Sequence, residues 1–334
     1  SMRRSKTVFL WIFLLAAVAG AFVLSLFMGR YMVSPGNVLS ILWKSLCRVP
    51  QDSMDVSIVM NIRMPRTILA LLVGAGLSVT GAAYQGMFQN PLVSPDVLGT
   101  SAGAAFGAVL GILLSGMDYR AMALSVVFGL MAVVLVFFLS KLSGQSTVIS
   151  LVLSGMIVQA MMNALISLSK YVADPTEKLP AITYWLMGSF VSANYGTLKL
   201  AALPILLGIA AIFALRWRIN VLSMGDEECI SLGIDPVRTR TMIIVACTVI
   251  TAASVMATGV IGWVGLVIPH IARMMTGVDH NKVIPASALT GGAFMILVDV
   301  AARSMTDSEL PIGILTALIG APFFAVLFWR QGRR

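Results

Sequence analysis

Charged residues are scarce in this 334-residue chain. Asp, Glu, Lys and Arg together make up 11% of it, whereas a soluble domain typically carries about 25%. Hydrophobic residues make up 58%. So few charges cannot cover the water-facing surface of a protein of this size, so the composition excludes a large soluble domain and predicts an integral membrane protein.

Residue types that carry enzyme or metal chemistry are also few. The three cysteines lie far apart without a CxxC pair, and the two histidines have no Cys or carboxylate set at metal-ligand spacing. A GxxxxGK[ST] loop, an HExxH helix and a nucleophile elbow are all missing, so the chain cannot cradle ATP phosphates by a P-loop. We therefore predict no catalytic residue, no metal site and no cofactor, and we favour a structural or interfacial role for His270 and His280.

Long apolar runs dominate what remains. A bilayer core of about 30 Å needs roughly 20 apolar residues per helix, and residues 8–29 form such a run behind Arg3, Arg4 and Lys6. These charges predict a cytoplasmic N-terminus; a signal peptide is disfavoured because the run is long and more spans follow. The later predicted spans are residues 64–87, 93–114, 121–140, 147–169, 191–214, 239–258, 261–277, 283–303 and 311–329. The predicted fold is a single all-α, polytopic transmembrane domain over residues 1–334, with about ten transmembrane helices and both termini cytoplasmic.

The net charge of +9 does not point to a nucleic-acid partner, because the basic residues lie mainly in short segments between apolar runs. On the predicted topology, Lys and Arg are only slightly more frequent inside than outside, which suggests another role for some external arginines. Arg63 and Arg66 open the second span, and Arg303 ends the ninth, four residues after Asp299 and on the same helix face. We expect Asp299 to orient Arg303. Concentrated external arginines suit docking of an acidic partner, with snorkelling anchors at the lipid surface as the alternative.

Three polar segments interrupt the apolar runs. Residues 31–56 are predicted to be external and to hold a short amphipathic helix at 38–46, and residues 170–180 form an external segment with an Asp-Pro turn signal. Residues 216–240 are cytoplasmic and are the most charged stretch. There we predict two short amphipathic helices, the second starting at Pro236, as a docking surface for a soluble partner; an ordinary solvated loop is the alternative. Acids in the first turn and a C-capping glycine mark the first of these helices, at Asp226, Glu227, Glu228 and Gly233.

The fifth predicted span has one mixed face. A single helical stripe carries Met156, Gln159, Asn163 and Ser167. Amides in a span usually face other helices or water instead of lipid. The stripe can line a solute pathway or supply interhelical hydrogen bonds, and the sequence leaves both interpretations open.

Several long motifs, in order, resemble the FecCD family, the permeases of type II ABC importers typified by the cobalamin importer. They are RMPRTILALLVGAG (63–76), GAAYQGMFQNPL (81–92), PDVLGTSAG (95–103), YWLMGS (184–189), GWVGLVIPHIAR (262–273) and ELPIG (309–313) with TALIGAPF (316–323). The resemblance covers roughly residues 57–328. It implies a ten-helix protomer in a bacterial or archaeal cytoplasmic membrane, working as a homodimer around a central channel. Two ABC ATPase subunits would dock inside, and an extracytoplasmic substrate-binding protein would deliver cargo outside.

The same resemblance assigns roles to particular residues. Arg63, Arg66 and Arg303 would receive carboxylates of the binding protein, and residues 226–233 would contact the ATPase, although Glu228 and Cys229 stand where the family usually has Ala. Cytoplasmic gates would lie at residues 90–92 and 146–149. The gate residues so assigned are Asn90, Leu92, Val148 and Ile149.

The function predicted from the sequence is therefore that of a permease subunit, not an enzyme, in an ATP-driven importer of a metal chelate: an iron–siderophore complex, haem or a corrinoid. The ATP would be hydrolysed by the separate ATPase. A secondary transporter driven by an ion gradient is the alternative, but that class usually shows buried acids in mid-span and discontinuous helices. Here Asp299 is the only convincing acid within a span. A membrane-embedded enzyme ranks third, for lack of a catalytic set.

Overall fold

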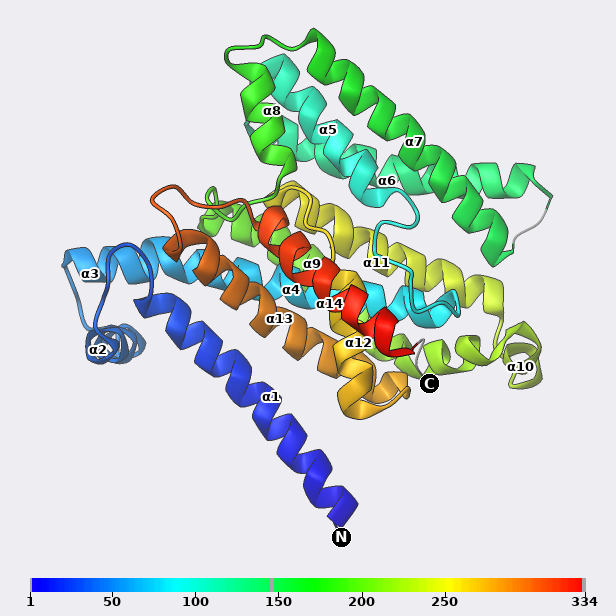
Figure 1. Ribbon diagram of the computed structural model, residues 1–334, viewed down its shortest axis with the longest axis horizontal. Coiled ribbons are helices and arrows are strands. Elements are labelled where there is room, and N and C mark those ends of the chain that lie inside the picture. Colours follow the sequence, from blue (N-terminus) through cyan, green and yellow to red (C-terminus); the bar gives the residue numbers. More distant parts are fainter. Residues whose placement is uncertain (1, 145–146, 332–334) are drawn as a thin grey trace.

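A computed structural model describes residues 2–144 and 147–331 of the chain, and within these residues all regular secondary structure is helical (Figure 1). The helices are α1 (Met2–Phe27), α2 (Pro35–Leu46), α3 (Met54–Val56), the π-helix η1 (Ser57–Arg63), α4 (Met64–Met87), α5 (Thr100–Ser115), α6 (Tyr119–Leu142), α7 (Val148–Val172), α8 (Lys178–Leu186), α9 (Tyr195–Met224), α10 (Asp226–Ser231), α11 (Pro236–Thr258), α12 (Val264–Thr276), α13 (His280–Ser304) and α14 (Ile312–Gln331). The predicted all-α class is confirmed.

Eight helices in the described part of the chain are long and apolar enough to cross a membrane. They are α1, the continuous α3–η1–α4 unit, α6, α7, α9, α11, α13 and α14. The helices α5 and α12 are apolar but shorter, with 16 and 13 residues, so at about 1.5 Å per residue each is shorter than a bilayer core. Each predicted apolar stretch overlaps one of these helices, and the polytopic architecture is confirmed.

Helix α4 is the central element of the bundle. In the continuous α3–η1–α4 unit, 83% of the residues in the most apolar stretch are buried. The corresponding share for α1, which lies at the periphery, is 11% (Figure 1). Small residues allow the close packing: a Cβ added to Gly81 of α4 would lie 1.7 Å from the carbonyl oxygen of Gly265 in α12. Backbones that approach this closely leave room only for glycine. The packing fixes both ends of α4, one near α2 and the other near α10, which lie at opposite ends of the molecule (Figure 1).

The two polar segments predicted to be external agree with the sequence prediction in part. The amphipathic helix expected at 38–46 is α2, which starts at Pro35 because the Ser34 side chain caps it. The Asp-Pro turn is also present: the Asp174 carboxylate accepts a hydrogen bond from the Glu177 amide at 2.9 Å. Helix α8, which has nine residues, was not predicted. It lies directly after this turn signal and is too short to produce a clear apolar period.

One prediction for residues 216–240 is wrong. Helix α9 continues to Met224, well past the predicted span, and only α10 is a separate short helix. The expected second short helix is the first part of the long α11, because Asp235 caps its first turn and Pro236 occupies N1, immediately before the apolar run. The segment therefore presents one short helix held between two long ones.

Candidate functional site

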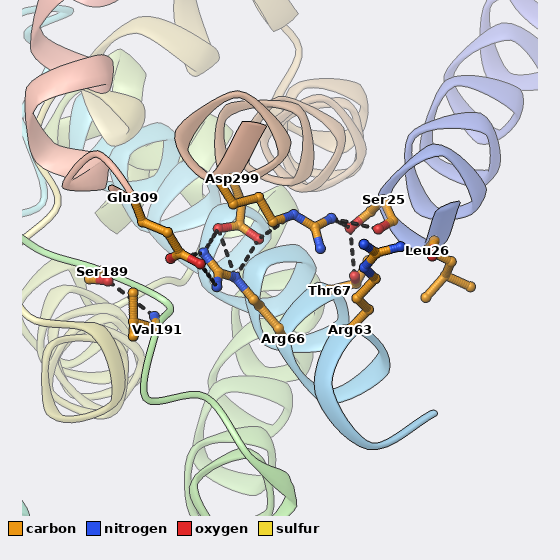
Figure 2. Close-up of polar contacts among 10 residues, drawn as sticks. Ser25, Leu26, Arg63, Arg66, Thr67, Ser189, Val191, Asp299 and Glu309 are labelled. Atoms are coloured by element: carbon orange, nitrogen blue, oxygen red, sulfur yellow. Dashed lines mark hydrogen bonds and ion pairs between the residues drawn. The ribbon is translucent and has the colours of Figure 1, made fainter. Parts of the chain in front are cut away.

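A buried ionic cluster joins four parts of the chain at the end of the molecule near α2 (Figure 2). Arg66, in the first turn of α4, binds two carboxylates. Its Nη2 lies 2.8 Å from Oδ1 of Asp299 on α13 and 2.8 Å from Oε2 of Glu309, in the segment between α13 and α14. Its Nε and Nη1 donate to the same two carboxylates at 3.0 Å. Bidentate pairs of this kind are the strong, geometrically specific ones.

Arg303 and Arg63 complete the cluster on the α1 side. Arg303 Nη2 donates to the Ser25 carbonyl at 2.6 Å, while its Nε lies 3.9 Å from Asp299 Oδ2. Arg63 Nη1 donates to the Leu26 carbonyl at 2.9 Å. The predicted pairing of Asp299 with Arg303 is therefore the weaker contact, because Arg66 reaches across from α4 to take the carboxylate. Sequence spacing reports only neighbours on the same helix face.

The arginines do not lie open to solvent in the isolated chain. Arg63 is 5% exposed, and Arg66 and Arg303 are each 6% exposed. Three guanidinium groups face two carboxylates, which leaves one net positive charge. Glu309 was not predicted as a site residue, and the only signal for it in the sequence is its place at the start of the ELPIG motif.

The segment of residues 216–240 presents α10 as a fixed protrusion (Figure 1). The first turn of α10 carries the three predicted acids. Gly233, just after the end of the helix, has φ +75°. Asp226 forms an ion pair with the buried Arg240 of α11. Cys229, on the inner side of α10, is fully buried, and its carbonyl accepts from the Ile234 amide at 2.8 Å. These contacts hold α10 firmly against α11.

Exposed apolar side chains on this protrusion were not predicted. Met224, Ile230 and Leu232 are 58%, 66% and 55% exposed, beside the exposed acids Glu227 and Glu228. Large exposed apolar residues gathered among charged residues are typical of a protein–protein contact. We call Met224, Glu227, Glu228, Ile230 and Leu232 the α10 face.

A second network ties the base of this protrusion to α13. Asn220 of α9 donates to Asp279 at 2.7 Å and accepts from the His280 amide at 2.7 Å. Partial burial raises the pKa of Asp279, but hydrogen bonds from Asn220 and Asn281 outweigh that effect and hold the pKa below its ordinary value. His280 serves packing here, as predicted. In the described part of the chain, no group of three or more His, Cys, Asp and Glu side chains is placed to hold a metal ion.

Of the four residues predicted as gates, Asn90, Leu92 and Ile149 are exposed, whereas Val148 is half-buried. Leu92 is 61% exposed in the turn after α4, where its amide donates to Asn90 Oδ1 at 2.9 Å. Val148 and Ile149 form the start of α7, and Ile149 is 70% exposed. Ser146, in the predicted range 146–149, lies outside the described residues. The gating role of all four residues stays a prediction.

The mixed stripe of α7 borders a recess of about 520 Å³. Gln159, Asn163 and Ser167 line it, whereas Met156 is 58% exposed and does not. Gln159 also donates to the carbonyl of Asp96, in the loop before α5. The remaining lining residues are Asp96, Ser101, Ala102, Ala105, Ile166, Lys170, Leu186 and Val260. Three of the four predicted residues thus share one polar recess.

The comparison with known proteins agrees with this architecture. A profile of the FecCD transport family matches residues 14–330. The chain belongs to the FecCD transport family. This FecCD permease is 40% identical over 311 residues to the molybdate import system permease protein MolB of Haemophilus influenzae, covering 93% of this chain and 92% of that protein. It is 42% identical over 274 residues to a probable iron chelatin transport system permease protein of Helicobacter pylori, covering 82% of each.

A solved structure is similar over nearly the whole chain of this FecCD permease. It shows an inward-facing conformation of a metal-chelate type ABC transporter, with a TM-score of 0.86 and 39% identity, covering 96% of this chain and 98% of that one. The relatives are transport permeases. The chain is therefore a multi-pass membrane permease of the ABC importer class found in bacteria and archaea.

Proposed function

We propose that this chain is the channel-forming subunit of an ATP-driven, binding-protein-dependent importer of a metal chelate. It would work as a dimer of two copies, each with ten transmembrane helices and cytoplasmic termini, in the cytoplasmic membrane. The observation that carries the proposal is the α10 face, a rigidly held protrusion whose exposed apolar and acidic side chains match neither a lipid surface nor an ordinary loop.

The two ends of the molecule fit two kinds of partner. The α10 face would receive one ABC ATPase subunit per permease copy, with Asp226 and Gly233 fixing its geometry and Glu227 and Glu228 in contact. At the opposite end, the arginine cluster of Arg63, Arg66 and Arg303 would receive acidic side chains of a substrate-binding protein. ATP binding and hydrolysis would move the α10 face and bias the dimer between outward- and inward-open populations.

The cargo proposed is an iron–siderophore complex, haem or a corrinoid. The polar recess beside α7 would line part of the pathway, with amides and hydroxyls that bind a large chelate only weakly. The chain would break no covalent bond and would hold no resident cofactor. Asn90, Leu92, Val148 and Ile149 would close the cytoplasmic end.

The alternative, an ion-gradient-driven transporter, needs a carboxylate that gains and loses an ion during the cycle. Asp299 is fully buried and bound by Arg66 through two hydrogen-bonding nitrogens. A carboxylate held in this way favours a structural role over ion coupling, which supports the ATP-driven importer.

The test is co-purification of the permease with an ABC ATPase subunit co-expressed from the same organism. We expect a stable complex with equal numbers of permease and ATPase subunits, measured by size-exclusion chromatography with light scattering. Replacing Ile230 and Leu232 together with serine should prevent the complex, because exposed apolar anchors carry much of the affinity of such contacts. Leu114, 70% exposed at the end of α5, provides the matched control: Leu114→Ser should leave the complex intact. An ATPase that fails to bind the unmodified permease contradicts the proposal.

A further inference from the structure

We propose that Glu309 is an internal substitute for the docking partner's carboxylate: it occupies on Arg66 the position that an acidic side chain of the binding protein takes, so that docking proceeds by exchange of one carboxylate for another. The inference rests on the proposed function, because it assumes that a binding protein docks at this end. It adds a residue that determines how strongly and how selectively the permease binds that partner.

Arg66 has almost no unused hydrogen-bond donors. A guanidinium group has five N–H donors. Arg66 directs Nε and Nη2 to Asp299, and Nη1 and Nη2 to Glu309. With 6% of its surface exposed, it cannot accept a third carboxylate in this arrangement. A partner's acid can reach Arg66 only when one of the two present carboxylates leaves (Figure 2).

Only one of the two carboxylates bound to Arg66 can leave. The Asp299 side chain is 1% exposed, sits within helix α13 and lies near Arg303 as well as Arg66. The Glu309 side chain is 27% exposed and belongs to the non-helical segment before α14. Moving Asp299 would leave buried arginines uncompensated, which is strongly unfavourable, whereas Glu309 can turn into water and be replaced by an equal charge. Glu309 is therefore the exchangeable member.

The exchange of the Glu309 carboxylate for the partner's carboxylate is reversible. Backbone hydrogen bonds hold the chain in place directly after Glu309. The Leu310 amide donates to the Ala302 carbonyl at 2.9 Å. The Ile312 and Gly313 amides donate to the carbonyls of Gly188 and Met187, also at 2.9 Å. The side chain can thus swing away while the backbone keeps it within reach of Arg66. When the partner leaves, Glu309 can pair again and neutralise the site.

One donor of the cluster makes only a long ion-pair contact, 3.9 Å from Asp299 Oδ2. Arg303 Nε is buried without a hydrogen-bond partner. An incoming carboxylate that displaces Glu309 would meet both the freed nitrogens of Arg66 and a cluster whose net charge has risen by one. This favours an acidic side chain over a neutral polar one and gives the docking site its selectivity.

The experiment measures binding of a substrate-binding protein from the same organism to the intact permease–ATPase complex in nanodiscs. Glu309→Gln keeps the size of the side chain but removes its charge, and is expected to tighten docking at least about fivefold. Asp307, exposed two residues earlier in the same segment, provides the matched control. Asp307→Asn removes the same charge from the same surface without contacting Arg66 and should change the affinity less than about twofold.

The outcomes separate the inference from the proposed function. If the binding protein does not bind the unmodified complex, the proposed function fails. If it binds, and folded Glu309→Gln permease binds it equally or more weakly, the exchange is wrong. An equal gain for Asp307→Asn also contradicts it, because the effect would then come from long-range charge. If Glu309→Gln yields no folded permease, Glu309→Asp decides: its shorter reach should still tighten docking at least about twofold, and no tightening overturns the inference.

Discussion

Replacing Asp299 with leucine is expected to lower the free energy of unfolding of the permease by about 3–5 kcal/mol. The carboxylate is fully buried and compensates Arg66, with Arg303 nearby. Leucine fills a similar volume but leaves buried guanidinium groups with one acid, Glu309, among them. The measurement is a titration of the purified permease with sodium dodecyl sulfate in mixed micelles, followed by far-UV circular dichroism.

Two further variants make this result specific. Asp307→Asn removes an exposed acid nearby and should change the free energy of unfolding by less than about 0.5 kcal/mol. Arg66→Met combined with Asp299→Leu removes both partners and should cost clearly less than the sum of the two single changes, because the uncompensated charge is gone. Unfolding of Asp299→Leu at the same detergent fraction as the unmodified protein would show that the ion pair does not stabilise the fold.

Replacing Glu227 with alanine and Gly233 with valine together is expected to abolish ATP-driven uptake while leaving the permease folded. Gly233 has φ +75°, a backbone conformation that β-branched residues adopt only with strain. Valine there should displace Ile234, whose amide closes the turn onto Cys229. Because α10 would lose its position as well as an exposed acid, we expect ATPase binding to weaken by about 2 kcal/mol or more, roughly thirtyfold in Kd.

The chain offers a close control for that pair. Gly277, in the turn between α12 and α13, has φ +84° and nothing within 4 Å of an added Cβ. Gly277→Val therefore introduces similar strain at a turn outside the α10 face, and uptake should persist. Uptake is measured in proteoliposomes and ATPase binding by surface plasmon resonance. Normal uptake by the Glu227 and Gly233 variant would show that α10 does not couple the ATPase to the channel.

The membrane architecture could be predicted from sequence because long apolar runs have few structural alternatives. The boundaries could not: α9 extends to Met224 because the polar residues after its apolar run continue the same helix. Asp235-Pro236 was correctly interpreted as a helix start, but the length of the helix that follows depends on the apolar run behind it. A local capping signal marks where a helix begins and carries no information on where it ends.

The site residues, too, could be predicted only in part from the sequence. The stripe of Gln159, Asn163 and Ser167 was visible because all three residues share one helix, whereas Asp96, in the loop before α5, joins the recess through tertiary packing. The arginine cluster was predicted as three basic residues, but its pairing with Glu309 spans more than 240 positions, from Arg66. Contacts between helices distant in sequence are set by packing, which no periodic pattern in one sequence reports.

The central claim is that ATP hydrolysis by a partner drives import through this permease. The most direct measurement is uptake into proteoliposomes that hold the permease with its co-purified ABC ATPase. The proteoliposomes are supplied outside with the binding protein and, in turn, with a ferric hydroxamate siderophore, haem or cyanocobalamin. We predict that one of these cargoes accumulates only when ATP is enclosed and the binding protein is present. Accumulation driven by a proton or sodium gradient, without ATP or without the ATPase, would contradict the account.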